Sequence, residues 1–279
     1  ALSPIAIIYS RSSWNPNPMP FFALLSVFSL HQLWQGKDRK FMLLGAASFA
    51  FALQMHYLGL LLIPTLAVFW LLSLKIVKKS AKETKQFLIT SLKSLLIFIF
   101  LMSPLVLFDL KHQGMNFQAF KAFFTTRQTT VNLNPGNSDR FIPVWNKITS
   151  DLLLGQEEQG VALMSFSIFV LGLWALMKEK KKNSVIVLFT WILFAILGLS
   201  MYKQHVYAHY FGFFWPAIYI LAGWIISRLL QGTYAHKFLS IFLLSWLVVV
   251  SIANSPLKQT PNHQLQRTEN IVNLVIKES

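Results

Sequence analysis

Long apolar stretches separated by short polar turns run along most of the chain. A helix needs about 20 mostly apolar residues to cross the hydrocarbon core of a bilayer. The pattern therefore predicts an all-α polytopic membrane protein with about eight transmembrane helices, preceded at residues 1–9 by the end of a truncated helix. The predicted spans are residues 19–34, 41–55, 57–74, 87–108, 161–177, 184–201, 211–226 and 238–253.

A polar turn interrupts the apolar pattern just before residue 19. It carries Arg11 and Trp14 and ends in three prolines, Pro16, Pro18 and Pro20. Because proline cannot continue a helix interior, the turn predicts a break between two membrane helices. An arginine at such a break is costly unless it reaches water, a lipid headgroup or a phosphate. We therefore expect this turn at a membrane surface.

Two segments of the polar connection between residues 109 and 160 are amphipathic. Each places its apolar residues on one side of a helix, so both are predicted to lie flat at the membrane interface. The apolar positions are Phe117, Phe120 and Phe124 in the first segment and Val144, Trp145, Ile148 and Leu152 in the second.

The end of the chain is predicted to be a separate polar tail. Residues 1–253 form the transmembrane core, and residues 254–279 follow as an extracytoplasmic tail. Ile271, Val272 and Val275 are spaced for one short amphipathic helix within this tail.

Composition and charge agree with the membrane interpretation. The chain of 279 residues is 54% hydrophobic and 13% charged, whereas a soluble domain carries about 25% charged residues. A net charge of +15 would suggest nucleic acid in a soluble protein. Here the basic residues lie in turns between spans, as orientation signals do, so we expect no nucleic-acid partner and place these turns in the cytoplasm. They are Lys37, Arg39 and Lys40; Lys75, Lys78, Lys79, Lys82 and Lys85; Lys178, Lys180, Lys181 and Lys182; Arg228 and Lys237.

Nine polar or aromatic residues lie at helix ends on the predicted outer side. Cationic and hydrogen-bonding side chains that converge on one membrane face suit an anionic lipid phosphate. Each also has an ordinary explanation, since arginine and tryptophan anchor helices at interfaces and a histidine between spans can be a hydrogen-bonded kink residue. The nine are Arg11, Trp14, Asn15, His56, Tyr57, Asp109, Lys111, His209 and Tyr210.

No metal or other cofactor is indicated by the sequence. His205 and His209 have the spacing of metal ligands one helical turn apart. However, Val206 stands where a metalloprotease has glutamate, and no third ligand is evident. The absence of cysteine excludes disulfides and thiolate metal sites.

Two non-enzymatic classes stay open at this level. Ion-coupled transporters usually keep a carboxylate at mid-membrane, and no acidic residue lies deep in a predicted span. A transporter or flippase of lipid-linked glycans would have a central polar cavity that opens in turn to both faces. A structural membrane subunit would instead expose an apolar face on residues 109–160 with no pocket beneath it.

Four segments carry a likeness to a known family through their order and spacing. They read SPIAIIYSRSSWNPNPMPFF, GAASFAFALQMHYLGLLLIPTL, SPLVLFDLKHQGMNF and YAHYFGFFWPAIYILAG. With the basic turn between the first two, this pattern resembles bacterial glycosyltransferase family 39. These membrane enzymes are related to the protein O-mannosyltransferases and the lipid A aminoarabinose transferase. The likeness extends from residue 3 to about residue 253.

The resemblance implies a C-type glycosyltransferase fold in the bacterial plasma membrane, with an extracytoplasmic site. Such enzymes take a sugar from a polyprenyl-phosphate carrier and pass it to a lipid, glycan or protein acceptor. The catalytic base of the family is an acidic residue in the first outer loop. That loop is expected upstream of Ala1 and is not in this sequence, so the chain alone is expected to be inactive. Arg11 matches the family's Ser-Arg turn, and His56-Tyr57 and His209-Tyr210 match two further motifs of the donor pocket.

Overall fold

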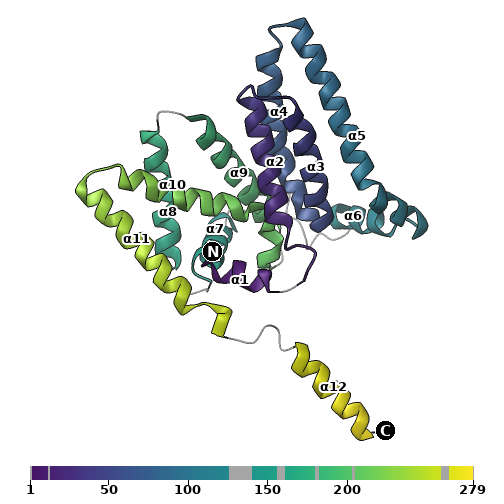
Figure 1. Ribbon diagram of the computed structural model, residues 1–279, viewed down its shortest axis with the longest axis vertical. Coiled ribbons are helices and arrows are strands. Elements are labelled where there is room, and N and C mark those ends of the chain that lie inside the picture. The colour runs from purple at the N-terminus through teal and green to yellow at the C-terminus, as the bar shows by residue number, and fades with distance from the viewer. Residues whose placement is uncertain are drawn as a thin grey trace.

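The computed structural model describes residues 2–11, 13–125, 140–155, 161–179, 182–202, 205–258 and 264–278. In these ranges every regular element is a helix, as predicted (Figure 1). The first half contains α1 (Pro4–Ser10), α2 (Met19–Trp34), α3 (Lys40–Met55), η1 (Tyr57–Leu62), α4 (Ile63–Val77), α5 (Ala81–Lys111) and α6 (Met115–Thr125). The second half contains α7 (Phe141–Leu153), α8 (Val161–Lys178), α9 (Lys182–Ser200), η3 (Ala208–Phe214), α10 (Trp215–Leu230), α11 (Tyr234–Ala253), η4 (Pro256–Lys258) and α12 (Gln264–Glu278).

Five helical segments in the described residues are long and apolar enough to cross a bilayer. Shorter apolar helices occupy three further predicted spans. The described part of the chain is therefore all-α, with the helices of a membrane protein. The five long segments are Tyr57–Val77, Ala81–Lys111, Asn183–Ser200, Ala208–Leu230 and Tyr234–Ala253, and the shorter ones are Met19–Trp34, Lys40–Met55 and Met164–Lys178.

Small side chains allow α2 and α3 to pack closely. A β-carbon on Gly45 would lie 2.7 Å from Leu30 Cδ2 and 3.3 Å from Ser29 Cβ. The Ser29 hydroxyl donates to the Leu25 carbonyl of its own helix, at 2.7 Å, so it brings no unsatisfied polar group into the contact. This is the usual way for membrane helices to approach one another.

His56 ends α3 and starts the next helical segment. Its backbone is extended, with φ of −161°, and its Nδ1 accepts a hydrogen bond from the Leu58 amide at 3.2 Å. The ring therefore satisfies an amide that the first turn of a helix leaves unpaired. The 3-10 helix η1 follows, and α4 continues from it. The predicted break at this residue is confirmed.

The helix α5 has 31 residues and continues through Pro104. Proline lacks the amide that would donate to the carbonyl of Phe100, four residues earlier. The Ser103 hydroxyl donates to that carbonyl instead, at 2.6 Å. One residue on, Gln54 Nε2 of α3 donates to the Leu101 carbonyl at 3.0 Å, which ties the two helices together.

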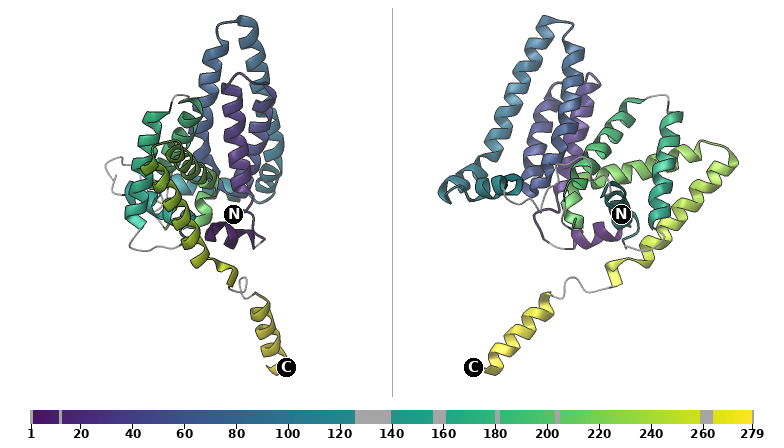
Figure 2. Two further views of the ribbon diagram at one scale, coloured as in Figure 1. Left: turned by 60° about the vertical axis from the view of Figure 1, so that its left-hand side comes forward. Right: turned by 180° about the vertical axis from the view of Figure 1, so that it is seen from behind.

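The helix α6 leaves α5 at a sharp bend (Figure 2). Gln113 and Gly114 both have positive φ, at 57° and 72°. The Asp109 carboxylate spans the bend and accepts from the amides of Asn116 (2.6 Å) and Phe117 (3.1 Å) in the first turn of α6. Asp109 therefore caps α6. The predicted amphipathic helix is present here, although the Phe124 side chain lies outside the described residues.

The apolar side of α7 is covered by other helices of the protein. The helix is amphipathic, and the four apolar residues predicted to share one side are buried. That side packs against α1, α8, α9 and α10 rather than being left for lipid. Trp145 Nε1 also donates to the Ser165 carbonyl of α8, at 3.0 Å. An apolar stripe on a helix does not by itself distinguish a lipid neighbour from a protein neighbour.

Both chain-terminal regions meet near α7. The Ser3 hydroxyl donates to the Leu152 carbonyl at 2.7 Å and accepts from the Tyr219 hydroxyl at 2.8 Å. After α11, Asn254 Nδ2 donates to the Leu154 carbonyl at 2.8 Å. The predicted amphipathic tail helix is present as α12, which stands apart from the other helices in every view (Figures 1 and 2).

The basic turns are gathered toward one side of the molecule, the upper side of Figure 1. Arg39, before α3, forms an ion pair with Glu83 of α5. Arg228 of α10 forms one with Glu179, just after α8. These pairs join neighbouring turns. Lys180 and Lys181 of the third basic turn lie outside the described residues.

Candidate functional site

Aromatic and imidazole rings from three separate segments meet on the side opposite the basic turns. The His209 ring lies 4.4 Å from the Trp14 ring and 5.8 Å from the His56 ring, between centroids. The His56 ring also lies 4.5 Å from Tyr57 and 5.1 Å from Tyr210. We call these five residues the ring cluster. Five of the nine predicted site residues are thus neighbours, although up to 196 positions separate them in the chain.

Buried neighbours hold the ring cluster in place. His209 and Tyr210 are on η3, which is anchored by the fully buried side chains of Phe211, Phe213 and Phe214. Trp14 lies in the turn between α1 and α2, where it stacks on Tyr9 with 6.0 Å between centroids and 15° between planes. The Trp14 ring nevertheless stays 47% exposed, so one part of it is available to a ligand.

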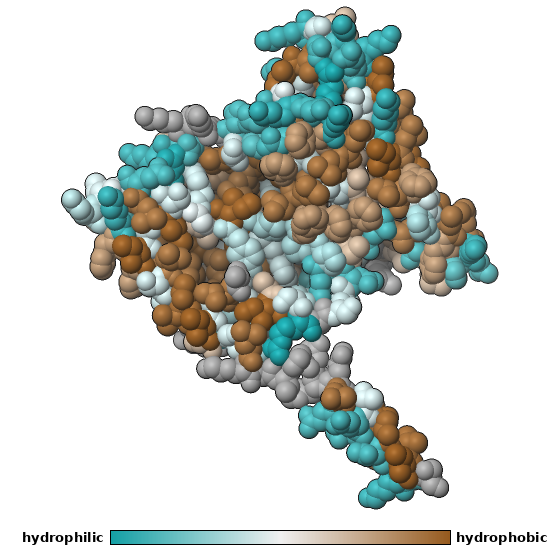
Figure 3. Space-filling model, viewed as in Figure 1, coloured by the Kyte–Doolittle hydropathy of each residue, from teal (hydrophilic) through white to brown (hydrophobic). Residues whose placement is uncertain are grey.

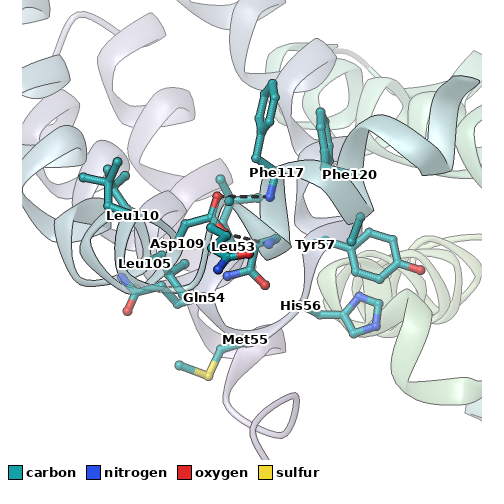
Figure 4. A pocket seen from close by; sticks show the side chains of 15 residues that line it. Leu53, Gln54, Met55, His56, Tyr57, Leu105, Asp109, Leu110, Phe117 and Phe120 are labelled. Atoms are coloured by element: carbon teal, nitrogen blue, oxygen red, sulfur yellow. Dashed lines mark hydrogen bonds between the residues drawn. The ribbon is translucent and has the colours of Figure 1, made fainter.

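A cavity of about 1160 Å³ adjoins the ring cluster. His56 and Tyr57 form one side of it, and the end of α5 and the start of α6 form the other (Figure 4). Most of the lining is apolar. Its polar side chains are Gln54, His56 and Tyr57 on one side and Asp109, Gln113 and Asn116 at the bend between α5 and α6. The lining side chains include Leu53, Gln54, Met55, Leu105, Val106, Leu110, Gln113, Asn116, Phe117 and Phe120.

His56 is a neutral ring in this environment. Burial lowers its pKa to about 4, and the neighbouring His209 acts in the same direction. Because Nδ1 already accepts from the Leu58 amide, the proton of the neutral ring is on Nε2. The ring therefore presents one N–H donor on the side away from the helix cap.

Acid is expected to destabilise the protein through His56. The folded-state pKa is below the ordinary value of 6.5, so between pH 6.5 and about 4 the unfolded chain binds a proton that the folded protein does not. Folding stability should fall as pH falls through this window, by about 2 kcal/mol after allowing for partial exposure. Thermal unfolding in detergent at pH 7 and pH 4.5 measures the loss.

A His56→Asn variant provides the comparison for that measurement. Asparagine can keep the cap on the Leu58 amide but does not titrate, so the variant should lose part of the acid sensitivity. Equal acid sensitivity in the two proteins would contradict the assignment.

The other predicted site residues lie outside the ring cluster. Arg11 Nη1 donates to the Pro256 carbonyl at 2.6 Å and so connects α1 to the segment after α11. Asn15 and Lys111 are exposed and do not line the cavity. Asp109 does line it, with its carboxylate turned to the α6 amides (Figure 4). The structure therefore gives Arg11 and Asp109 clear structural contacts.

The catalytic base has no assigned residue at this site. Two described acids have partners of their own: Asp109 caps α6, and Asp151 forms an ion pair with Lys147 at 3.4 Å. The position of the base therefore stays a prediction that rests on the resemblance.

Three residues near the ring cluster were not selected from the sequence. Tyr9 lies between Trp14 and Trp215, with ring centroids 6.0 Å and 5.4 Å away. Tyr202 lies 5.8 Å from the Tyr210 ring, and the Arg140 guanidinium donates to the Tyr202 carbonyl. Their aromatic and cationic character was visible in the sequence, but nothing local distinguished them from other interface residues.

The described residues contain no group of three or more histidine, aspartate or glutamate side chains that could hold a metal ion. His205 precedes η3 in non-helical backbone, so the one-turn spacing to His209 does not apply. Its ring lies 4.7 Å from Tyr207 instead.

Comparisons with known proteins identify no family. No protein-family model matches the chain, and no curated protein or solved structure matches it. The functional conclusion is therefore built on the arrangement of the chain's own residues and on the resemblance of its sequence segments.

Proposed function

We propose that the protein is a membrane glycosyltransferase. It transfers a sugar from a polyprenyl-phosphate donor to a lipid, glycan or protein acceptor on the extracytoplasmic face of the bacterial plasma membrane. The observation that supports this best is the joining of the ring cluster to a large, mostly apolar cavity through His56 and Tyr57. A prenyl-linked sugar phosphate likewise combines an apolar tail, which would fit the cavity, with a polar head, which would fit the ring cluster.

The apolar lining of the cavity suits the prenyl chain. Leu105, Leu110 and Phe117 line it from α5 and α6, and contact with such side chains removes about 25 cal/mol of unfavourable hydration per Å² of apolar surface. The exposed part of the Trp14 ring offers a flat surface for a sugar, and such rings combine an apolar face with a polar edge.

The ring cluster supplies hydrogen-bond donors for the phosphate. The Arg140 guanidinium lies near the cluster, because it donates to the carbonyl of Tyr202, whose ring is 5.8 Å from Tyr210. As the bond between the anomeric carbon and the phosphate oxygen breaks, negative charge grows on the phosphate. Donors fixed in place stabilise that charge more than they stabilise the bound donor.

The transfer step conserves atoms and charge. The acceptor hydroxyl attacks the anomeric carbon, its proton passes to an acidic base, and the electron pair of the broken bond leaves with polyprenyl phosphate. No residue of this sequence is assigned as the base. An outer position of the ring cluster is supported by the positive-inside rule, because the basic turns lie on the opposite side of the molecule (Figure 1).

The test uses the full-length protein in proteoliposomes with a polyprenyl-phosphate donor that carries a labelled sugar. Transfer of label to an acceptor supports the proposal. Movement of the labelled lipid across the bilayer without transfer would establish a flippase instead. Absence of both activities with a panel of hexose and pentose donors would contradict the proposal.

Arg11→Ala is expected to reduce transfer about tenfold in the same assay if the guanidinium leaves the Pro256 carbonyl to bind the leaving phosphate of the donor. Arg11→Lys keeps the charge and should recover part of the activity. Thermal unfolding of both variants separates this effect from loss of the Pro256 contact. Full activity in Arg11→Ala would remove Arg11 from the mechanism.

A further inference from the structure

The connection between α4 and α5 is a concentrated source of positive charge at the end opposite the ring cluster. It rises above the neighbouring α2–α3 turn in Figures 1 and 2. Its only acid, Glu83, forms an ion pair with Arg39. None of its lysines is ion-paired with another described residue. The exposed lysines are Lys75, Lys78, Lys79, Lys82 and Lys85.

Two of these lysines, Lys78 and Lys85, line the same groove. The Thr84 hydroxyl contacts the carbonyls of Val77 (3.1 Å) and Ser80 (2.9 Å), which ties the first turn of α5 to the end of α4. Lys78 and Lys85 consequently line one groove of about 670 Å³. Lys75 and Lys79 are not part of its lining.

Below the lysines the groove is apolar. Leu88, Ile89 and Leu92 line it, and their side chains are 48%, 44% and 58% exposed. They lie one to two turns further along α5, at the start of its predicted span. Figure 3 shows the corresponding change from a hydrophilic tip to a hydrophobic flank in this part of the molecule.

The acid of this turn faces a different cavity. Glu83 lines a separate pocket of about 460 Å³ together with Arg39 and Lys37. At 100° per residue, Glu83 and Lys85 point about 160° apart on α5. The groove that contains Lys78 and Lys85 therefore keeps its positive charge.

We propose that this groove binds an anionic phospholipid. Lys78 and Lys85 bind the headgroup phosphate, and an acyl chain lies along Leu88, Ile89 and Leu92. Lysines at the end of a membrane helix attract anionic headgroups, and the span beneath them lies at the depth of acyl chains. A nucleic acid or an acidic protein would satisfy the lysines but leave the apolar floor without a partner.

The experiment compares phosphatidylglycerol with phosphatidylcholine of identical acyl chains. Native mass spectrometry of the purified protein in a non-ionic detergent gives the fraction bound at each lipid concentration. Wild type should bind phosphatidylglycerol about tenfold more tightly. The Lys78→Gln/Lys85→Gln variant should lose about tenfold to thirtyfold in phosphatidylglycerol affinity, with phosphatidylcholine binding unchanged.

Lys75→Gln/Lys79→Gln is the matched control, because it removes the same charge outside the groove. It should change phosphatidylglycerol affinity less than threefold, and both variants should unfold at the wild-type temperature. Equal losses of phosphatidylglycerol affinity in the two variants would show that the lipid is attracted by the overall positive charge and not by this groove, and would overturn the proposal. If millimolar glycerol 3-phosphate displaces the lipid, the headgroup alone accounts for binding, and the proposed contact of the acyl chain with the groove is wrong.

Discussion

His209→Ala is expected to lower the kcat/KM of sugar transfer about a hundredfold. The imidazole lies at the centre of the ring cluster, in contact with both Trp14 and His56. If the leaving phosphate binds here, alanine removes a fixed hydrogen-bond donor, and the loss of one such donor commonly costs a factor of about 100 to 1000. The measurement is initial transfer rate against donor concentration in proteoliposomes.

The matched control for this prediction is His205→Ala. His205 is exposed and contacts Tyr207 rather than the ring cluster's histidines, so its removal should leave transfer within about threefold of wild type. Thermal unfolding of His209→Ala checks that the variant is folded. A folded His209→Ala protein with wild-type kcat/KM would exclude the residue from donor binding and weaken the proposed function.

Glu179→Gln is expected to lower the free energy of unfolding by about 3 kcal/mol. The carboxylate forms an ion pair with Arg228 and accepts from Trp224 Nε1 at 3.4 Å. Only 12% of the Glu179 side chain and 23% of the Arg228 side chain is exposed. The substitution leaves the Arg228 guanidinium partly buried without its counter-charge. The free-energy cost of this uncompensated charge is larger than the net stabilisation that the ion pair provides. Denaturant titration in detergent measures the change.

Two further variants make this prediction specific. Asp38→Asn removes the carboxylate of a pair with Lys40 in which the side chains are 59% and 85% exposed, so it should cost less than about 0.5 kcal/mol. Glu179→Gln/Arg228→Met removes both charges and should recover much of the stability. If the double variant is less stable than Glu179→Gln, Arg228 has other favourable contacts and the uncompensated charge is not the cause.

The helices were largely predictable because their apolar stretches are long. The predicted bounds of residues 19–34 agree with α2, and the break at His56 was visible as a polar residue between two apolar stretches. The start of α5 was missed by six residues, because lysines conceal a helix from a hydrophobicity pattern. Ser80 caps this basic first turn by accepting from the Glu83 amide.

The site was only partly predictable, for a geometric reason. Sequence reasoning could select His56 and His209 as polar groups at helix ends, but their contact depends on how the two halves pack. Arg140 and Tyr202 were missed because their hydrogen bond joins residues 62 positions apart, and such a contact leaves no pattern in the neighbouring sequence. Arg11 was correctly recognised as a residue at a break, but its bond to Pro256 joins segments 245 positions apart.

Pro104 gives the cavity an adjustable wall. Because Pro104 has no amide hydrogen, the Phe100 carbonyl accepts from the Ser103 hydroxyl instead of from a backbone amide. This point of α5 is next to Leu105 and Val106, which line the cavity. Helices bend most readily where a backbone bond is absent, so the end of α5 can swing together with the attached α6. A cavity with such a wall can accommodate ligands of different thickness while the helices packed elsewhere in the protein keep their positions.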